Sequence, residues 1–278
     1  MFSSVPGPIG IFDSGYGGLT IFDKIRAAMP GYDYIYLGYN ARSPYGTRSF
    51  EVVYRFTKQA VETLFNEGCQ LVILACNTAS AKALRTIQQR DLPQWDPARR
   101  VLGVIRPTVE LMDKISKSKH VGILGTTGTI TSDSYSLEIK KMFPHMTVTG
   151  EACPMWVPLV ENNEFDSPGA DYFVRKHLEH ILAADPEIDT LVLGCTHYPL
   201  LIEKIKAFLP EGITLFSQGE YVAASLTDYL RRHPEMDIRL TKQGNCRFLT
   251  TESAAKFSDA ASVFLNHPVE VEQIRLVE

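Results

Sequence analysis

Short runs of apolar residues alternate along the chain with longer stretches in which apolar residues recur every three or four positions. The short runs are rich in Val, Ile and Leu, which is typical of parallel strands buried on both faces. The longer stretches predict helices over 51–67, 79–89 and 171–182. Strands that alternate with helices predict an α/β fold built on parallel sheets. The predicted strands are Ile9–Phe12, Tyr34–Leu37, Leu71–Ala75, Val101–Val104, Val121–Leu124 and Leu191–Leu193.

Two strand-to-turn segments occur twice in the chain, in the same order. Residues 9–15, Ile-Gly-Ile-Phe-Asp-Ser-Gly, resemble residues 121–127, Val-Gly-Ile-Leu-Gly-Thr-Thr. Residues 71–78 resemble residues 191–197, and in both of these segments a buried strand ends at a cysteine that hydrogen-bonding residues follow. Ligands of open α/β sheets bind beyond the carboxyl ends of the strands. The repeat therefore predicts two pseudo-symmetric domains with the active site in the cleft between them.

Breaks in the pattern suggest where the chain crosses between the domains. Pro93 and Pro97 interrupt a helical stretch beside the charged segment 96–100, and a second break lies near Pro210 and Gly212. We therefore expect residues 1–97 and 213–278 to form the first α/β domain and residues 98–212 to form the second.

Composition and charge narrow the classes of function. The 28 basic and 32 acidic residues give a net charge of −4 without a long run of either sign, which indicates neither a nucleic-acid partner nor a membrane surface. The opening residues lack a basic segment before an apolar one, and no apolar run reaches the roughly 18 residues of a membrane span. We expect a cytoplasmic protein that acts on a small molecule.

The number and spacing of the five cysteines are not those of a disulfide-bonded or zinc-binding protein. Their number is odd and no two are spaced as in a CxxC motif, so we expect neither disulfides nor structural zinc. Cys76 and Cys195 differ from the other three because both follow a strand and precede polar residues. A thiol is a candidate acid or base because its ordinary pKa of about 8.5 lies near working pH. Packing is the alternative for either cysteine alone.

Two opposed proton carriers are the requirement for inverting an amino-acid α-carbon, because one group removes the proton and the other delivers a proton to the opposite face. Asp13 and His197 are the expected tuners of the two thiols, since a carboxylate or an imidazole accepts, returns or fixes a thiol proton. Asp13 as a turn or cap residue and His197 as a loop histidine are the alternatives.

The residues around these groups are suited to binding anions. The segment 13–18, Asp-Ser-Gly-Tyr-Gly-Gly, is predicted to present backbone N–H groups to a substrate carboxylate. It lacks the Lys-Ser/Thr of a phosphate loop and the spacing of a dinucleotide loop. The pairs Asn77-Thr78 and Thr196-His197 offer donors for a second carboxylate and for the α-ammonium group, or else cap helices.

Four separated motifs together resemble the successive signatures of glutamate racemases. They are Phe-Asp-Ser-Gly-Tyr-Gly-Gly at 12–18, Pro-Tyr-Gly at 44–46, Ala-Cys-Asn-Thr-Ala at 75–79 and Gly-Cys-Thr-His-Tyr-Pro-Leu at 194–200. They span most of the chain in family order. The resemblance implies two facing α/β domains, one thiol from each, and formation of D-glutamate for peptidoglycan without pyridoxal phosphate or a metal.

The same resemblance implies roles for individual residues. Residue Glu161 lies in a segment, Val-Pro-Leu-Val-Glu, that is similar to the family segment with a further catalytic-site glutamate, and we expect it to act on the Cys195 side; a solvated charge is the alternative. We also expect a homodimer that binds glutamate. The residues implied to contact substrate or tune the thiols are Asp13, Ser14, Tyr45, Gly46, Asn77, Thr78, Thr196 and His197.

Some residues depart from the family pattern. They are Asn40, Arg106, Thr108 and Gln218, and they predict differences in the packing around the cleft rather than in the reaction. A racemase of aspartate or a related amino acid is one alternative function. A catalytically silent dicarboxylate-binding regulatory protein is another, although such a protein has no need for two proton carriers.

Overall fold

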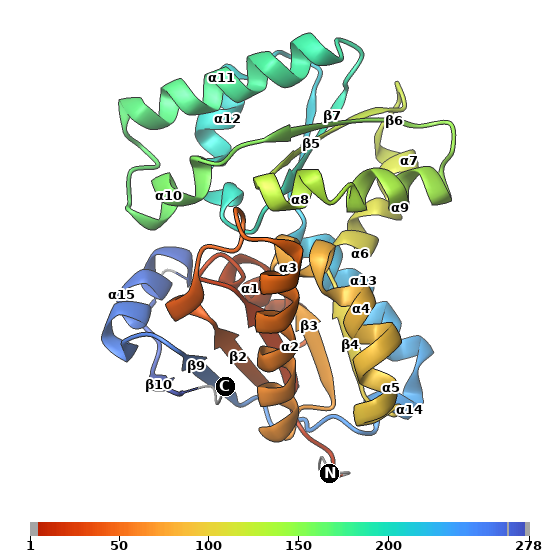
Figure 1. Cartoon of the computed structure of the whole chain (residues 1–278), viewed down its shortest axis with the longest axis vertical. Coiled ribbons are helices and arrows are strands. Elements are labelled where there is room, and N and C mark those ends of the chain that lie inside the picture. The colour runs from red at the N-terminus through yellow and green to blue at the C-terminus, as the bar shows by residue number, and fades with distance from the viewer. Residues whose placement is uncertain (1–4, 266, 276–278) are drawn as a thin grey trace.

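The computed structural model describes residues 5–265 and 267–275, which form two α/β lobes, one above the other in Figure 1. The two parallel sheets at the centres of the lobes confirm the predicted fold class. The strands are β1 (Ile9–Asp13), β2 (Tyr34–Gly38), β3 (Leu71–Leu74), β4 (Arg100–Gly103), β5 (His120–Gly125), β6 (Thr147–Ala152), β7 (Thr190–Gly194), β8 (Thr214–Phe216), β9 (Cys246–Thr250) and β10 (Val271–Gln273).

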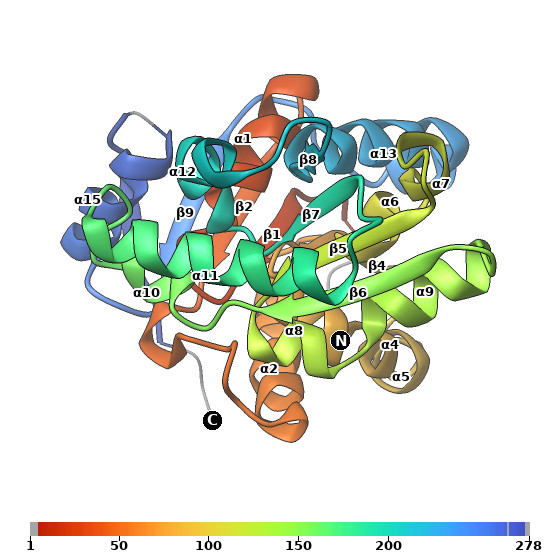
Figure 2. The same cartoon turned by 90° about the horizontal axis from the view of Figure 1, so that it is seen from above.

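Helices cover both faces of each sheet (Figure 2). None of the helices in the described ranges is both long and apolar enough to cross a bilayer. The helical elements are α1 (Leu19–Ala28), η1 (Asn40–Arg42), α2 (Phe50–Asn66), α3 (Asn77–Lys82), α4 (Leu84–Thr86), η2 (Ile87–Asp91), α5 (Leu92–Trp95), α6 (Ile105–Val109), α7 (Met112–Ile115), α8 (Thr127–Thr131), α9 (Ser134–Met142), α10 (Trp156–Glu161), α11 (Pro168–Ala184), η3 (Tyr198–Leu201), α12 (Ile202–Phe208), α13 (Gly219–Arg232), α14 (Pro234–Asp237) and α15 (Ala254–Leu265).

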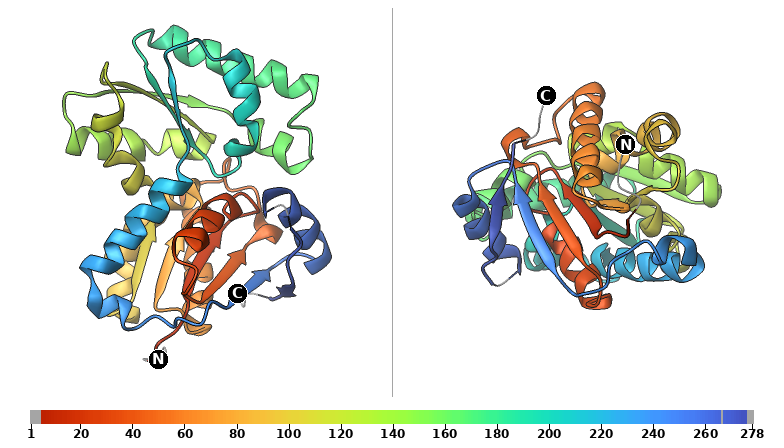
Figure 3. Two further views of the ribbon diagram at one scale, coloured as in Figure 1. Left: turned by 180° about the vertical axis from the view of Figure 1, so that it is seen from behind. Right: turned by 90° about the horizontal axis from the view of Figure 1, so that it is seen from below.

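The larger sheet has the order β10-β9-β2-β1-β3-β4 and the smaller sheet the order β6-β5-β7-β8. Successive side chains of a strand point to opposite faces. Ile9 and Ile11 of β1 therefore pack with α1, α13 and α15, while Phe12 packs with α2 on the other face. Figure 3 shows α1 and α13 side by side on the back of the larger sheet. The apolar runs of the sequence are continuous because both faces of each central strand are buried.

All six predicted strands are present, with bounds that differ by one residue at most. The predicted helices over 51–67 and 171–182 correspond to α2 and α11. The helical prediction over 79–89 is confirmed, but the segment is interrupted at Ala83 and divided among α3, α4 and the π-helical turn η2. Pro93 follows that turn and has no N–H to bond the carbonyl four residues back, so a regular α-helix cannot continue through it.

The crossings between the sheets lie later in the chain than the sequence predicted. The strand β4, at residues 100–103, pairs with β3 in the larger sheet, although the predicted second domain begins at residue 98. The strand β8, at residues 214–216, pairs with β7 in the smaller sheet, although the predicted return is at residue 213. Pro93 lies in the first turn of α5 and Pro97 follows the end of that helix, so neither marks a domain boundary. We therefore propose that the chain crosses after Gly103 and returns after Phe216.

Candidate active site

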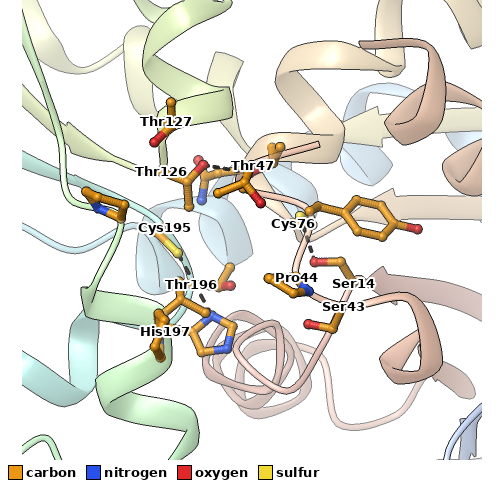
Figure 4. Close-up of a pocket in the computed structure, with 17 residues that line it drawn as sticks. Ser14, Ser43, Pro44, Thr47, Cys76, Thr126, Thr127, Cys195, Thr196 and His197 are labelled. Atoms are coloured by element: carbon orange, nitrogen blue, oxygen red, sulfur yellow. Dashed lines mark hydrogen bonds between the residues drawn. The ribbon is translucent and has the colours of Figure 1, made fainter. Parts of the chain in front are cut away.

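The carboxyl ends of the central strands of both sheets meet at one pocket between the lobes (Figure 4). The sulfur atoms of Cys76 and Cys195 approach this pocket from opposite sides. Its volume of ≈ 110 Å³ admits a small molecule and not a polymer. The residues that line it are Ser14, Ser43, Pro44, Tyr45, Gly46, Thr47, Cys76, Asn77, Thr78, Thr126, Thr127, Pro154, Val157, Pro158, Cys195, Thr196 and His197.

Cys76 follows β3 and caps the N-terminus of α3. Its Sγ accepts a hydrogen bond from the backbone N–H of Ala79 at 3.4 Å and lies 3.3 Å from the hydroxyl of Ser14. Burial, with the nearby charge of Asp13, raises the pKa of the Cys76 thiol to about 12, although both hydrogen bonds oppose the shift. Cys76 is therefore a protonated thiol at neutral pH.

Asp13 is the last residue of β1 and is almost wholly buried behind the pocket. Its Oδ2 accepts a hydrogen bond from the N–H of Gly15 at 2.9 Å, and its Oδ1 has no hydrogen-bond partner within the described chain. Burial raises the pKa of Asp13, while His197 and the N–H groups of Gly15 and Gly18 pull it down. A buried carboxylate with a free oxygen is a costly feature that a protein rarely keeps without a use.

Cys195 belongs to a chain of acid–base groups on the other lobe. Its Sγ lies 3.9 Å from Nδ1 of His197, and Nε2 of the same ring lies 3.1 Å from Oε1 of Glu161. Burial alone would lower the pKa of His197, but its hydrogen bonds to Cys195 and Glu161 outweigh burial and raise that pKa to about 10. The imidazole is therefore protonated at neutral pH and places a positive charge beside the sulfur of Cys195.

Comparison with known proteins agrees with this geometry. Residues 16–233 match the model of the Asp/Glu/Hydantoin racemase family. The chain is 39% identical to a glutamate racemase of Roseobacter denitrificans over 272 residues, which cover 94% of this chain and 98% of the relative. It belongs to the glutamate racemase family.

Solved structures of glutamate racemases share the fold over nearly the whole chain. A glutamate racemase isoform of Bacillus anthracis superposes with a TM-score of 0.88 at 34% identity, covering 97% of this chain and 98% of that one. The glutamate racemase of Francisella tularensis, whose structure is a complex with D-glutamate, superposes with a TM-score of 0.86 at 31% identity, and 98% of each chain is covered. The two facing sheets described above are thus the architecture of glutamate racemases.

The pocket of this glutamate racemase family member contains most of the residues predicted from the sequence. Cys76, Cys195, Ser14, Tyr45, Gly46, Asn77, Thr78, Thr196 and His197 line it. Asp13 and Glu161 are not lining residues: Asp13 is buried, and Glu161 pairs with His197 rather than being a lone charge.

One N–H group of the predicted anion-binding loop is already occupied inside the loop. The N–H of Gly15 donates to the carboxylate of Asp13. Gly17 packs so closely on the second lobe that a Cβ added to it would lie 2.4 Å from Nδ1 of His197. The glycines therefore allow the backbone of one lobe to approach the imidazole of the other.

Sequence reasoning missed several lining residues, among them Ser43, Thr47, Thr126 and Thr127. The internal repeat could have predicted Thr126, because residues 121–127 align with residues 9–15 and Thr126 is the equivalent of Ser14 in that alignment. Its hydroxyl lies 2.9 Å from that of Thr78 across the two lobes.

A closed ring of three hydrogen bonds lies directly behind the pocket. Nδ2 of Asn77 donates to Oε1 of Gln218 at 2.8 Å, Nε2 of Gln218 donates to the hydroxyl of Tyr135 at 2.8 Å, and that hydroxyl donates to Oδ1 of Asn77 at 2.6 Å. All three residues are buried. The ring joins α3, α9 and the start of α13, so both lobes hold the amide of Asn77 in one orientation.

The four departures from the family pattern have different surroundings. Gln218 also donates to the hydroxyl of Thr108 at 2.7 Å, so two of the departures are partners. Arg106 is exposed and pairs with Glu110, and Asn40 accepts a hydrogen bond from Thr250. Only Thr108 and Gln218 therefore affect the packing behind the pocket.

Proposed function

We propose that this protein interconverts L-glutamate and D-glutamate by proton transfer at Cα, with Cys76 and Cys195 as the two proton carriers. The observation that supports this most strongly is the position of the thiols. They come from equivalent strand ends of two sheets and approach one pocket from opposite sides. A substrate Cα held between them has one thiol on each face, which stereoinversion requires.

The surroundings of the thiols suggest which one begins as the proton donor. In the proposed step Cys195 removes the Cα proton, and Cys76, which its raised pKa keeps as a thiol, delivers its proton to the opposite face. The product complex then holds a Cys195 thiol and a Cys76 thiolate, with the hydroxyl of Ser14 as donor to that thiolate. The opposite enantiomer is converted by the reverse step, so the proton count is conserved in each direction.

The other polar side chains of the pocket are proposed to bind the substrate's charged groups. Hydroxyls and an amide come from both lobes and give charge-assisted hydrogen bonds to two carboxylates and an ammonium group. Asp13 has a free oxygen close to this site and is proposed to tune Cys76 or to accept from the ammonium group. The proposed binding residues are Asp13, Ser14, Tyr45, Gly46, Asn77, Thr78, Thr196 and His197, with Thr126 added by the structure.

Polarimetry of the purified protein with D-glutamate, and separately with D-aspartate, tests the substrate. We expect loss of optical rotation with glutamate and little or none with aspartate, without added cofactor or metal. Rotation lost faster with aspartate would assign the protein to the neighbouring specificity. Binding of glutamate without loss of rotation would favour the silent regulatory protein.

The cellular role follows from the resemblance to the family. The proposed product, D-glutamate, would supply peptidoglycan synthesis, and a cytoplasmic homodimer that needs no pyridoxal phosphate remains the expected form. Each of these points is a prediction from that resemblance.

The ring behind the pocket predicts a positioning role for Tyr135. Replacing Tyr135 by Phe removes the hydroxyl that links Asn77 to Gln218 and leaves two buried amide groups short of a partner, at about 1–3 kcal/mol. We expect kcat to fall about tenfold in both directions. A Tyr172→Phe change, on the exposed face of α11, is the matched control and should alter neither kcat nor KM. A loss of thermal stability in Tyr135→Phe with unchanged kcat and KM would show that Tyr135 has only a structural role.

A further inference from the structure

A second group of ionisable side chains lies at the edge of the smaller sheet, outside the pocket. Glu151 is near the end of the edge strand β6, and α11 packs against this strand. Thr149, two residues earlier and thus on the same face, bonds to Asp185 just after α11. His177 and His180 are three residues apart on α11 and share one side of the helix. Both imidazoles therefore face the carboxylate of Glu151.

The ligand-forming atoms of these three residues converge. Nδ1 of His177 lies 2.6 Å and Nδ1 of His180 lies 3.5 Å from the same oxygen, Oε1 of Glu151. One ligand-forming atom from each of the three residues lies within 4.8 Å of the others, which brings the three side chains within reach of a single metal ion. The side chain of His177 is 7% exposed, that of Glu151 21% and that of His180 57%, so the group is anchored inside and open on one side.

We propose that Glu151, His177 and His180 form a binding site for a divalent transition metal, with Zn²⁺ the best match. Imidazole nitrogen and carboxylate oxygen are the ligands that Zn²⁺ takes in proteins, and three protein ligands leave a fourth position for water. The buried His177 already has the carboxylate of Glu151 as its ion-pair partner. The second imidazole, directed at the same oxygen with the same ring nitrogen, is the feature that a shared metal explains.

The metal site is separate from the racemisation chemistry, since none of its three residues lines the pocket. The fluorescence of Trp156 can report whether the site is occupied. The ring of Trp156 meets that of His177 edge-on at 6.1 Å between centroids, and the chain's other tryptophan, Trp95, lies in the other lobe against Phe65. Occupancy of the site is therefore expected to change the fluorescence of Trp156.

Titration of the full-length Trp95→Phe variant with Zn²⁺, followed by the emission of Trp156 and by calorimetry, tests the site. We expect saturable binding of one ion per chain. In the same background, His180→Gln, at an exposed position that leaves the fold intact, should weaken binding at least about tenfold, as should His177→Gln. His233→Gln is the matched control, because His233 pairs with the exposed Glu235 elsewhere on the surface, and its affinity should not change.

Two results would overturn the site. One is no binding at micromolar Zn²⁺. The other is binding that persists in both histidine variants. If that binding is lost in Cys76→Ala, the ion is bound by the thiols of the pocket. Circular dichroism of each variant separates loss of the site from loss of the fold.

Discussion

Replacing either Cys76 or Cys195 by alanine is expected to reduce racemisation about 10⁴-fold in both directions, because each direction needs one thiol as the base and the other as the acid. Positioned acid–base groups contribute about 10²–10⁴-fold each. Both cysteines are small and buried, so alanine changes the packing little and the fold should persist. Initial rates from D-glutamate and from L-glutamate measure the effect.

Cys246→Ala is the control for this experiment. Cys246 is half-buried on β9, at the amino end of a strand far from the pocket, and its replacement should leave both rates unchanged. Near-normal turnover by the Cys76 or the Cys195 variant would rule out the proposed acid–base pair, and loss of one direction only would require a second group on that face.

The second large effect is expected at His197, whose imidazole contacts the Cys195 thiol and Glu161. Because the pKa of His197 is raised to about 10, the ring is a cation over the whole neutral range, and its Nδ1 lies 3.9 Å from the sulfur of Cys195. Replacing His197 by Asn removes this cation and the acid–base partner of Cys195, so the rate should fall about 10²-fold. The loss should be larger in the direction that uses Cys195 as the base.

Glu161→Gln gives the same hypothesis a pH test. The carboxylate of Glu161 helps to raise the pKa of His197, so its loss lowers that pKa. The cation then disappears at a lower pH, and the alkaline limb of the rate profile should move to lower pH in the variant. Glu164→Gln, at an exposed position just beyond α10, is the control and should keep the original profile. An unchanged alkaline limb in Glu161→Gln would show that the ion pair with Glu161 does not set the protonation state of His197.

The sequence predicted the central strands because strands buried on both faces are unbroken apolar runs, as in Leu71–Leu74. The edge strand β6 was missed because its residues, Thr-Val-Thr-Gly-Glu-Ala, are mostly polar and only partly buried. The two cysteines were found from their equal places in the internal repeat. Thr126 was available by the same reasoning, since it is the counterpart of Ser14.

Other features of the site depend on contacts that no local pattern contains. The ring of Asn77, Tyr135 and Gln218 joins residues separated by 58 and 141 positions from Asn77, and it forms only when both lobes are folded. The pairing of Glu161 with His197 also crosses 36 residues. The crossings between lobes were placed too early because proline marks the end of a helix equally well inside a domain and between domains.

The position of solvent deuterium during early turnover tests the two-thiol mechanism most directly. D-glutamate is incubated with the protein in D₂O, and both enantiomers are analysed before a tenth of the substrate has reacted. The mechanism predicts one deuterium at Cα of every newly formed L-glutamate, delivered by the thiol on the opposite face, while the remaining D-glutamate keeps its proton. Deuterium entering both enantiomers at equal rates, or a product that retains the original proton, would mean that one group acts on both faces and would contradict the mechanism.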